Sequence, residues 1–226
     1  TKIALDLYKI HEFRRGGDQF EMLPHETLIT EQLEHDIFGG SLAFDLLTKT
    51  GDKFSIYTAG QTVDRGSYYG AEGDRTAYGE TYDISTSSGL QYTGKFDILS
   101  GSKLIIGADH SYNHLNDIKL GADGADNSTI SNQTVNTYGS FAQYELDFNI
   151  LKLSAGLRYD NYQITDNEEE YDPLIGNVLV SRANILVNIF EGLQFRSSYA
   201  KGYRAPQIFD EDLHIETSGL RRITHD

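Results

Sequence analysis

Three arginines in the C-terminal half of the chain are the strongest candidates for a charged site. Arg158, Arg182 and Arg196 each lie in a segment where apolar and polar residues alternate, and each belongs to the polar set. Because alternating side chains point to opposite faces of a β-strand, neighbouring strands would place the three arginines on one polar wall. The carboxylates expected on the same wall are Asp160, Glu145 and Asp147. Such a wall could hold a partner domain or guide a substrate, or its charges could simply neutralise one another.

A second candidate site combines aromatic and arginine side chains further upstream. Arg65, Tyr68, Tyr69 and Arg75 all lie in the polar segment 64–80. Tyrosine and arginine are enriched among the residues that dominate binding energy. We therefore regard these four residues as substrate-binding candidates, and packing of the rings against the protein itself is the alternative.

Metal ligands are few. Asp123 and Asp126 offer the hard oxygens that Ca²⁺ prefers, but the segment 121–128 does not have the spacing of an EF-hand loop. His110 and His114 are four residues apart, which on a strand separates them by about 13 Å and prevents shared coordination. The chain contains no cysteine, which excludes disulfides, thiolate metal sites and a cysteine nucleophile. We predict no metal site and no cofactor, with Ca²⁺ in this loop as the weak alternative.

Composition and motifs exclude several classes of function. No phosphate-binding glycine loop, nucleophile elbow or zinc-binding His-Glu-x-x-His motif occurs, so we predict that the chain is not an enzyme. The net charge of −15 argues against nucleic acid as a partner, because phosphate contacts need a basic face.

The elements that position these side chains are predicted to be β-strands throughout. Alternation with a period of two residues recurs along the chain, and in the clearest segment Leu90 and Tyr92 share one face while Gln91 and Thr93 share the other. The nine predicted strands are 2–13, 27–48, 53–63, 82–98, 103–112, 134–149, 151–162, 178–189 and 193–203. Tyrosine and glycine are abundant, which also favours an all-β protein.

The connections between these segments alternate in length. The short ones are 49–52, 99–102, 149–151 and 190–192, and the long ones are 14–26, 64–80, 113–133 and 163–177. Membrane β-barrels have short periplasmic turns and long extracellular loops, whereas β-sandwiches have no reason to separate connections by length. We therefore predict an all-β fold, an antiparallel transmembrane β-barrel present as a segment of nine long strands. A soluble structural or adhesive β protein with two packed sheets is the alternative, and a passive porin is a weaker third.

Three motifs in a fixed order identify a family. The segments 138–145, 153–162 and 202–212 resemble the barrel of TonB-dependent outer-membrane receptors, in which two such strands precede an aromatic-Arg-Ala-Pro box. The box here consists of Tyr203, Arg204, Ala205 and Pro206. The segments 14–18 and 24–27 are similar to a subgroup described broadly as cobalamin, siderophore or colicin receptors. The resemblance covers essentially the whole chain.

The resemblance implies a barrel of Gram-negative outer membranes that is closed by an N-terminal plug and imports a scarce nutrient, with energy from the TonB complex. Residues 1–226 would then form part of this barrel, and we expect the plug and the remaining strands to lie outside them. The implied partners are the plug of the same receptor, the TonB complex, outer-membrane lipid and a small-molecule nutrient. The three arginines named first would face the lumen and the plug. A haem receptor of the same family is the alternative, with His214 and His225 as candidate ligands after the box.

Overall fold

A computed structural model of the chain describes residues 1–71, 73–96, 101–121, 127–168 and 172–202. The strands are β1 (Lys2–Gly17), β2 (Thr30–Leu47), β3 (Lys53–Gly70), β4 (Tyr78–Lys95), β5 (Lys103–Leu120), β6 (Ser128–Phe148), β7 (Leu151–Asp166), β8 (Leu174–Phe190) and β9 (Leu193–Ala200). A single 3₁₀ turn, η1 (Pro24–Glu26), lies between β1 and β2. The prediction of nine strands is confirmed. None of the helices in the described ranges has the length and apolar character that crossing a membrane requires.

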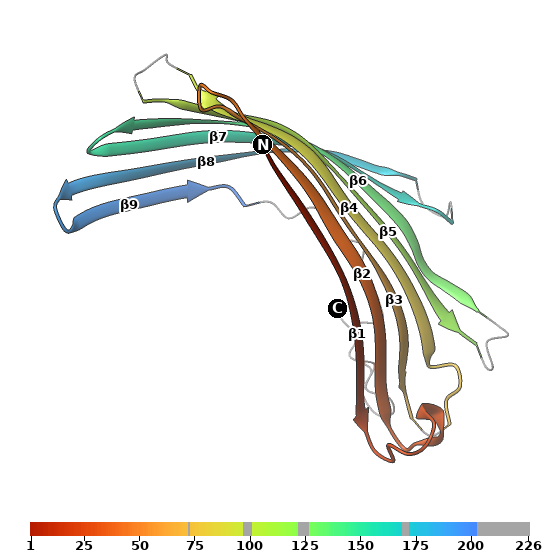
Figure 1. Ribbon diagram of the computed structural model, residues 1–226. Helices are drawn as coiled ribbons and strands as arrows, with labels where there is room; N and C mark the ends of the chain where they lie inside the picture. The colour runs from red at the N-terminus through yellow and green to blue at the C-terminus, as the bar shows by residue number, and fades with distance from the viewer. Residues whose placement is uncertain (72, 97–100, 122–126, 169–171, 203–226) are drawn as a thin grey trace.

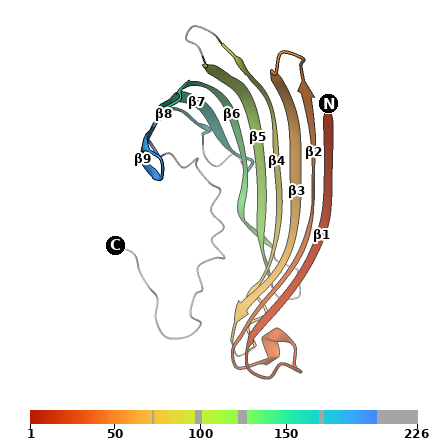
Figure 2. The same ribbon diagram turned by 60° about the vertical axis from the view of Figure 1, so that its left-hand side comes forward.

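All nine strands belong to one antiparallel sheet. Their order in space is their order in sequence, from β1 at one edge to β9 at the other. The sheet is strongly curved, as a segment of a barrel wall is (Figures 1 and 2). The alternative with two packed sheets is therefore wrong, because the described strands form a single sheet.

The predicted short connections all lie at one end of the sheet. A residue with positive φ occurs in each of the four short connections, at Gly51, Gly101, Asn149 and Gly192. Such angles match the twist of antiparallel hairpins and are favoured by glycine and asparagine. Three of the four predicted short connections are shorter than every connection at the opposite end, whereas the β4–β5 connection is as long as the β3–β4 connection.

The strands extend further into the predicted long loops than the sequence indicated. β5 continues to Leu120 and β6 begins at Ser128, so most of the predicted loop 113–133 is paired strand. Polar residues interrupt both faces of these strand ends, and a few apolar ones such as Leu115 and Ile130 lie among them. A continuous apolar alternation therefore does not mark them. Strands β1 to β8 have 16 to 21 residues, whereas about 10 suffice to cross a membrane, so they continue well beyond its apolar core.

The two faces of the sheet differ in polarity. Large apolar side chains on one face are 42% to 65% exposed, for example Leu5, Leu42, Ile56, Leu90, Ile106 and Leu157. The opposite face is polar, and several of its side chains are buried by their neighbours, including Asp117 and Asp160. Because side chains converge on the concave side of a curved sheet, the polar face is the lumen face and the apolar face is the outer face. This is the arrangement of a membrane barrel wall.

Candidate functional site

A bidentate charged contact on the lumen face joins β5 to β7, across the strand between them. The Arg158 guanidinium donates to both Asp109 oxygens, with Nη1–Oδ2 at 2.7 Å and Nη2–Oδ1 at 2.8 Å. Arg158 Nε also donates to Oδ2 of the buried Asp160 at 3.0 Å. The planar guanidinium matches this two-point geometry, which gives a strong and well-oriented ion pair. We call Arg158, Asp109 and Asp160 the Arg158 cluster.

Gly139 on β6 makes this contact sterically feasible. Asp109, Gly139 and Asp160 lie opposite one another on β5, β6 and β7. A Cβ atom at position 139 would overlap the Arg158 guanidinium and the Asp109 carboxylate. The same guanidinium lies 5.9 Å from the centre of the Phe141 ring, within reach of a cation–π contact. Arg158 can therefore cross β6 because residue 139 has no side chain.

A second polar network crosses the lumen face from β1 to β5, and we call it the lumen row. Its members lie directly opposite one another and are Glu12, His35, Arg65, Thr81 and Asp117. Arg65 Nη2 donates to Thr81 Oγ1 at 2.7 Å, and the Thr81 hydroxyl donates to Asp117 Oδ1 at 2.5 Å. Asp117 is fully buried, and Arg65 Nη2 lies 3.8 Å from its Oδ1.

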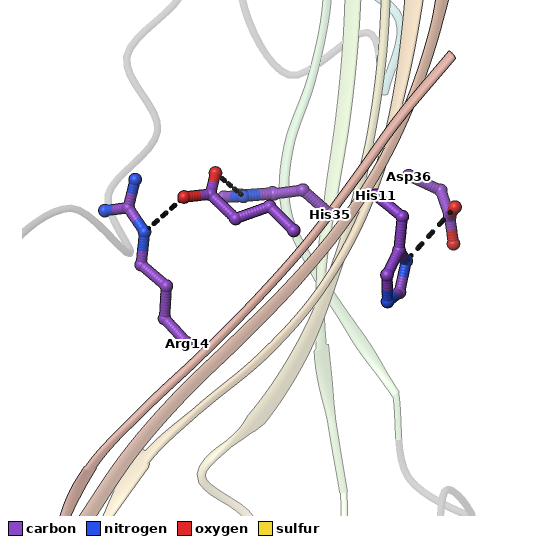
Figure 3. A network of polar contacts seen from close by, with 5 residues as sticks. His11, Arg14, His35 and Asp36 are labelled. Carbon is purple, nitrogen blue, oxygen red and sulfur yellow. Dashed lines mark hydrogen bonds and ion pairs between the residues drawn. The ribbon is translucent and has the colours of Figure 1, made fainter.

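The β1–β2 end of the lumen row holds a separate ion pair. Arg14 Nε donates to Glu12 Oε1 at 2.6 Å, and His35 Nδ1 lies 3.7 Å from Glu12 Oε2. Figure 3 shows Arg14 and His35 on one side of the strand pair, with His11 and Asp36 on the other. The row therefore combines acids and bases from four strands with the Thr81 hydroxyl of a fifth into one polar surface.

The three arginines predicted to share a wall do lie on one face of consecutive strands. The pairing register places Arg158 on β7, Arg182 on β8 and Arg196 on β9 on the lumen face. Arg182 and Arg196 are exposed, and within the described ranges neither forms an ion pair.

The acids predicted beside these arginines behave differently from one another. Asp160 contacts Arg158, whereas Asp147 pairs with Lys152 at 2.6 Å and Glu145 accepts from Gln143 at 2.5 Å. Asp109, which makes the bidentate contact, was not identified from the sequence. It falls on the polar face of its strand, but only the register and Gly139 show that a residue two strands away can reach it.

The residues of the second predicted site are not gathered on one surface. Arg65 and Tyr69 lie on the lumen face of β3, whereas Tyr68 lies on the outer face. Tyr68 is fully buried, with its ring 4.6 Å from that of Tyr78, whose hydroxyl is 2.9 Å from His25 Nδ1. The connection between β1 and β2 therefore covers Tyr68. Arg75 is exposed in the connection between β3 and β4, and a substrate-binding role for these residues stays a prediction.

The remaining candidates lie either outside the described residues or on the outer face. The box from Tyr203 to Pro206, the acids Asp123 and Asp126, and His214 and His225 are outside the described residues. His110 Nε2 lies 3.0 Å from Asn136 Oδ1, and His114 Nδ1 lies 3.3 Å from Thr134 Oγ1.

The described lumen wall offers fixed charge and hydrogen bonding, which suit binding and guidance of a ligand or a docked domain.

A family model described as "TonB dependent receptor-like, beta-barrel" matches residues 11–213. Comparison with curated proteins gives no match.

Several solved structures share the fold. The FrpB iron transporter from Neisseria meningitidis superposes with a TM-score of 0.65 at 13% identity, over 92% of this chain and 34% of that chain. The ferripyoverdine receptor of the outer membrane of Pseudomonas aeruginosa gives 0.62 at 14% identity, over 76% of this chain and 27% of that one. The copper transporter OprC gives 0.55 at 14% identity, over 74% of this chain and 30% of that one. The chain thus spans about a third or less of the length of these proteins.

Proposed function

The chain belongs to the TonB-dependent receptor β-barrel family, and we propose that it forms part of the wall of an outer-membrane receptor that imports a scarce nutrient with energy from the TonB complex. The observation that carries this proposal is the division of one curved antiparallel sheet into an apolar outer face and a charged lumen face. An apolar outer band suits lipid, and a polar interior suits a ligand path or a plug. Proteins of this family are transport receptors of the outer membrane, not enzymes.

We propose that Arg182 and Arg196 contact acidic groups of the plug. Both are exposed on the lumen face, and exposed guanidinium groups are suited to bidentate contacts with carboxylates. Arg158 is a weaker candidate for such a contact, because Asp109 and Asp160 already hold its guanidinium.

For the nutrient, we propose iron bound to a siderophore. Two similar structures are described as an iron transporter and as a ferripyoverdine receptor bound to its ligand, which supports this class. Cobalamin and haem are the alternatives within the same family, and one experiment separates all three.

The test is growth of a strain that lacks the full-length receptor gene, on one limiting nutrient at a time. We expect the deletion to abolish growth on one ferric siderophore and to leave growth on haem and on limiting cobalamin unchanged. Expression of the full-length receptor should restore growth, but not in a strain that also lacks TonB.

The arms of this test separate the nutrient from the transport mechanism. Loss of growth on haem or cobalamin alone would replace the proposed nutrient and retain the TonB-dependent mechanism. Restored growth without TonB, or unchanged growth on every source, would contradict the transport function itself.

A further inference from the structure

A cluster of metal-binding side chains lies on the outer face of β1 and β2, beyond the apolar band. His11 on β1 is directly opposite Asp36 on β2, and Glu34 is two residues from Asp36 on the same face. One ligand atom from each of the three residues lies within 4.8 Å of the others. All three side chains are exposed, and Figure 3 shows His11 beside Asp36, on the side of the strands away from His35.

We propose that His11, Glu34 and Asp36 form a binding site for a divalent transition-metal ion of the Zn²⁺ class. One imidazole nitrogen and two carboxylate oxygens are a donor set that Zn²⁺ uses, whereas Mg²⁺ and Ca²⁺ prefer oxygen ligands alone. Two paired strands supply the ligands, so the backbone holds them in place without a loop having to order. Because the side chains are exposed, water can complete the coordination.

The local charges favour a cation at this position. Asp36 lies directly opposite Asp64 on the next strand, and like charges in that relation destabilise a sheet. Lys9 Nζ lies 3.8 Å from Asp36 Oδ1, and the Lys9 side chain is 71% exposed. Such an exposed ion pair contributes little, so it does not satisfy the two aspartates. A bound divalent ion would offset the repulsion between them.

The imidazole is already oriented toward the carboxylate. His11 Nδ1 lies 3.4 Å from Asp36 Oδ1, and one of the two ring nitrogens must be unprotonated to bind a metal.

The opposite face of the same two strands supplies a matched control. His35 and Glu12 are also a histidine and a carboxylate on paired strands, 3.7 Å apart. Arg14 donates to Glu12 at 2.6 Å, so the carboxylate of Glu12 is already paired with a guanidinium group. Substitution of His35 should therefore leave metal binding unchanged.

The test is equilibrium dialysis of the full-length receptor in detergent against Zn²⁺ at pH 7.5. We expect His11→Gln, Glu34→Gln and Asp36→Asn each to lose about one equivalent of zinc relative to the wild type and to His35→Gln.

Cobalt gives a second measurement that does not depend on stoichiometry. The Co²⁺-loaded wild-type receptor and His35→Gln should share a visible absorption band that His11→Gln lacks. The three ligand positions are exposed and His35 is half-buried. All four substitutions preserve approximate shape, and heat-modified mobility on gels checks that each variant is folded. Equal zinc stoichiometry in the wild type and all three ligand variants, or a cobalt band that persists in His11→Gln, would overturn the proposal.

Discussion

Arg158 on β7 contacts Asp109 on β5 and Asp160 on β7, so its side chain links β5 to β7 across β6. Backbone pairing alone joins each of these strands only to its direct neighbours. The contact is partly shielded from water, since the side chains of Arg158 and Asp109 are 36% and 16% exposed. Removing Arg158 takes this partner from the carboxylates of Asp109 and Asp160, which are largely buried, and this costs more than the loss of a surface ion pair.

We expect Arg158→Met and Asp109→Asn to be strongly coupled. In a double-mutant cycle on the full-length receptor, the coupling free energy of unfolding should be about 1–3 kcal/mol, because both substitutions remove the same contact. Urea unfolding in detergent micelles, followed by circular dichroism, measures the free energy of unfolding of the wild type, the two single variants and the double variant. Additive effects of the two substitutions would show that the contact does not stabilise the fold.

Gly139 provides an independent check of the same contact. Gly139→Ala places a methyl group where the Arg158 guanidinium lies, so it should destabilise the wild type and have a smaller effect when Asp109→Asn is already present. Gly66→Ala on β3 is the matched control, because a Cβ atom there meets nothing within 4 Å. The two glycine substitutions should therefore differ in effect although both lie in strands.

At the scale of elements, the turn between β2 and β3 is tied to a third strand by one carboxylate. Asp52 Oδ2 accepts from the Thr50 hydroxyl at 2.7 Å, and Asp52 Oδ1 accepts from the backbone N–H of Lys95, at the end of β4, at 3.3 Å. The Thr50 hydroxyl is the largest cause that holds the pKa of Asp52 below its ordinary value, and the Lys95 N–H acts in the same direction. Since the pKa is lower in the folded turn, the ionised carboxylate stabilises the folded state above about pH 4, where aspartate is ionised in the unfolded chain. That contribution is lost as the pH falls through the folded pKa.

Thr50→Val should raise the pKa of Asp52 toward about 3.9, the value of an unperturbed aspartate. The carboxyl carbon shift of Asp52, followed by NMR from pH 2 to 6 in the solubilised receptor, measures this change. Thr76→Val, which removes the similar hydroxyl contact to Asp74 in another connection, should leave the titration of Asp52 unchanged. An Asp52 pKa that is the same in Thr50→Val and in the wild type would refute this account of the turn.

The elements show how far sequence reasoning reaches. Nine strands and their faces could be predicted because an apolar side chain at every second position marks a sheet with one face toward lipid or a core. The strand ends far from the short turns could not be predicted in this way. There β5, after Asn113, and β6, before Val135, present polar residues on both faces. The shared wall of Arg158, Arg182 and Arg196 was predictable from alternation, whereas the partner Asp109 depends on a register that only pairing defines.

At the scale of the whole molecule, the two faces of the sheet meet different environments. The apolar side chains of the outer face would be a continuous exposed patch in water, which soluble proteins rarely tolerate. The lumen face carries buried carboxylates and arginines that a lipid environment would not solvate. A membrane barrel gives each face a suitable environment, since its wall separates lipid on the outside from a polar interior.

Adjacent residues on one strand should therefore report opposite environments. In the full-length receptor reconstituted in lipid, a nitroxide at Leu90 should be relaxed strongly by oxygen and weakly by a water-soluble nickel complex, and one at Gln91 should show the reverse. Leu90 is 59% exposed on the outer face, and Gln91 lies on the lumen face of the same strand. Ile56 and Ser55, which pair with them on β3, should repeat the contrast and exclude a local effect of either label. Equal oxygen accessibility at Leu90 and Gln91 would mean that the outer face does not contact lipid, and the barrel interpretation would then fail.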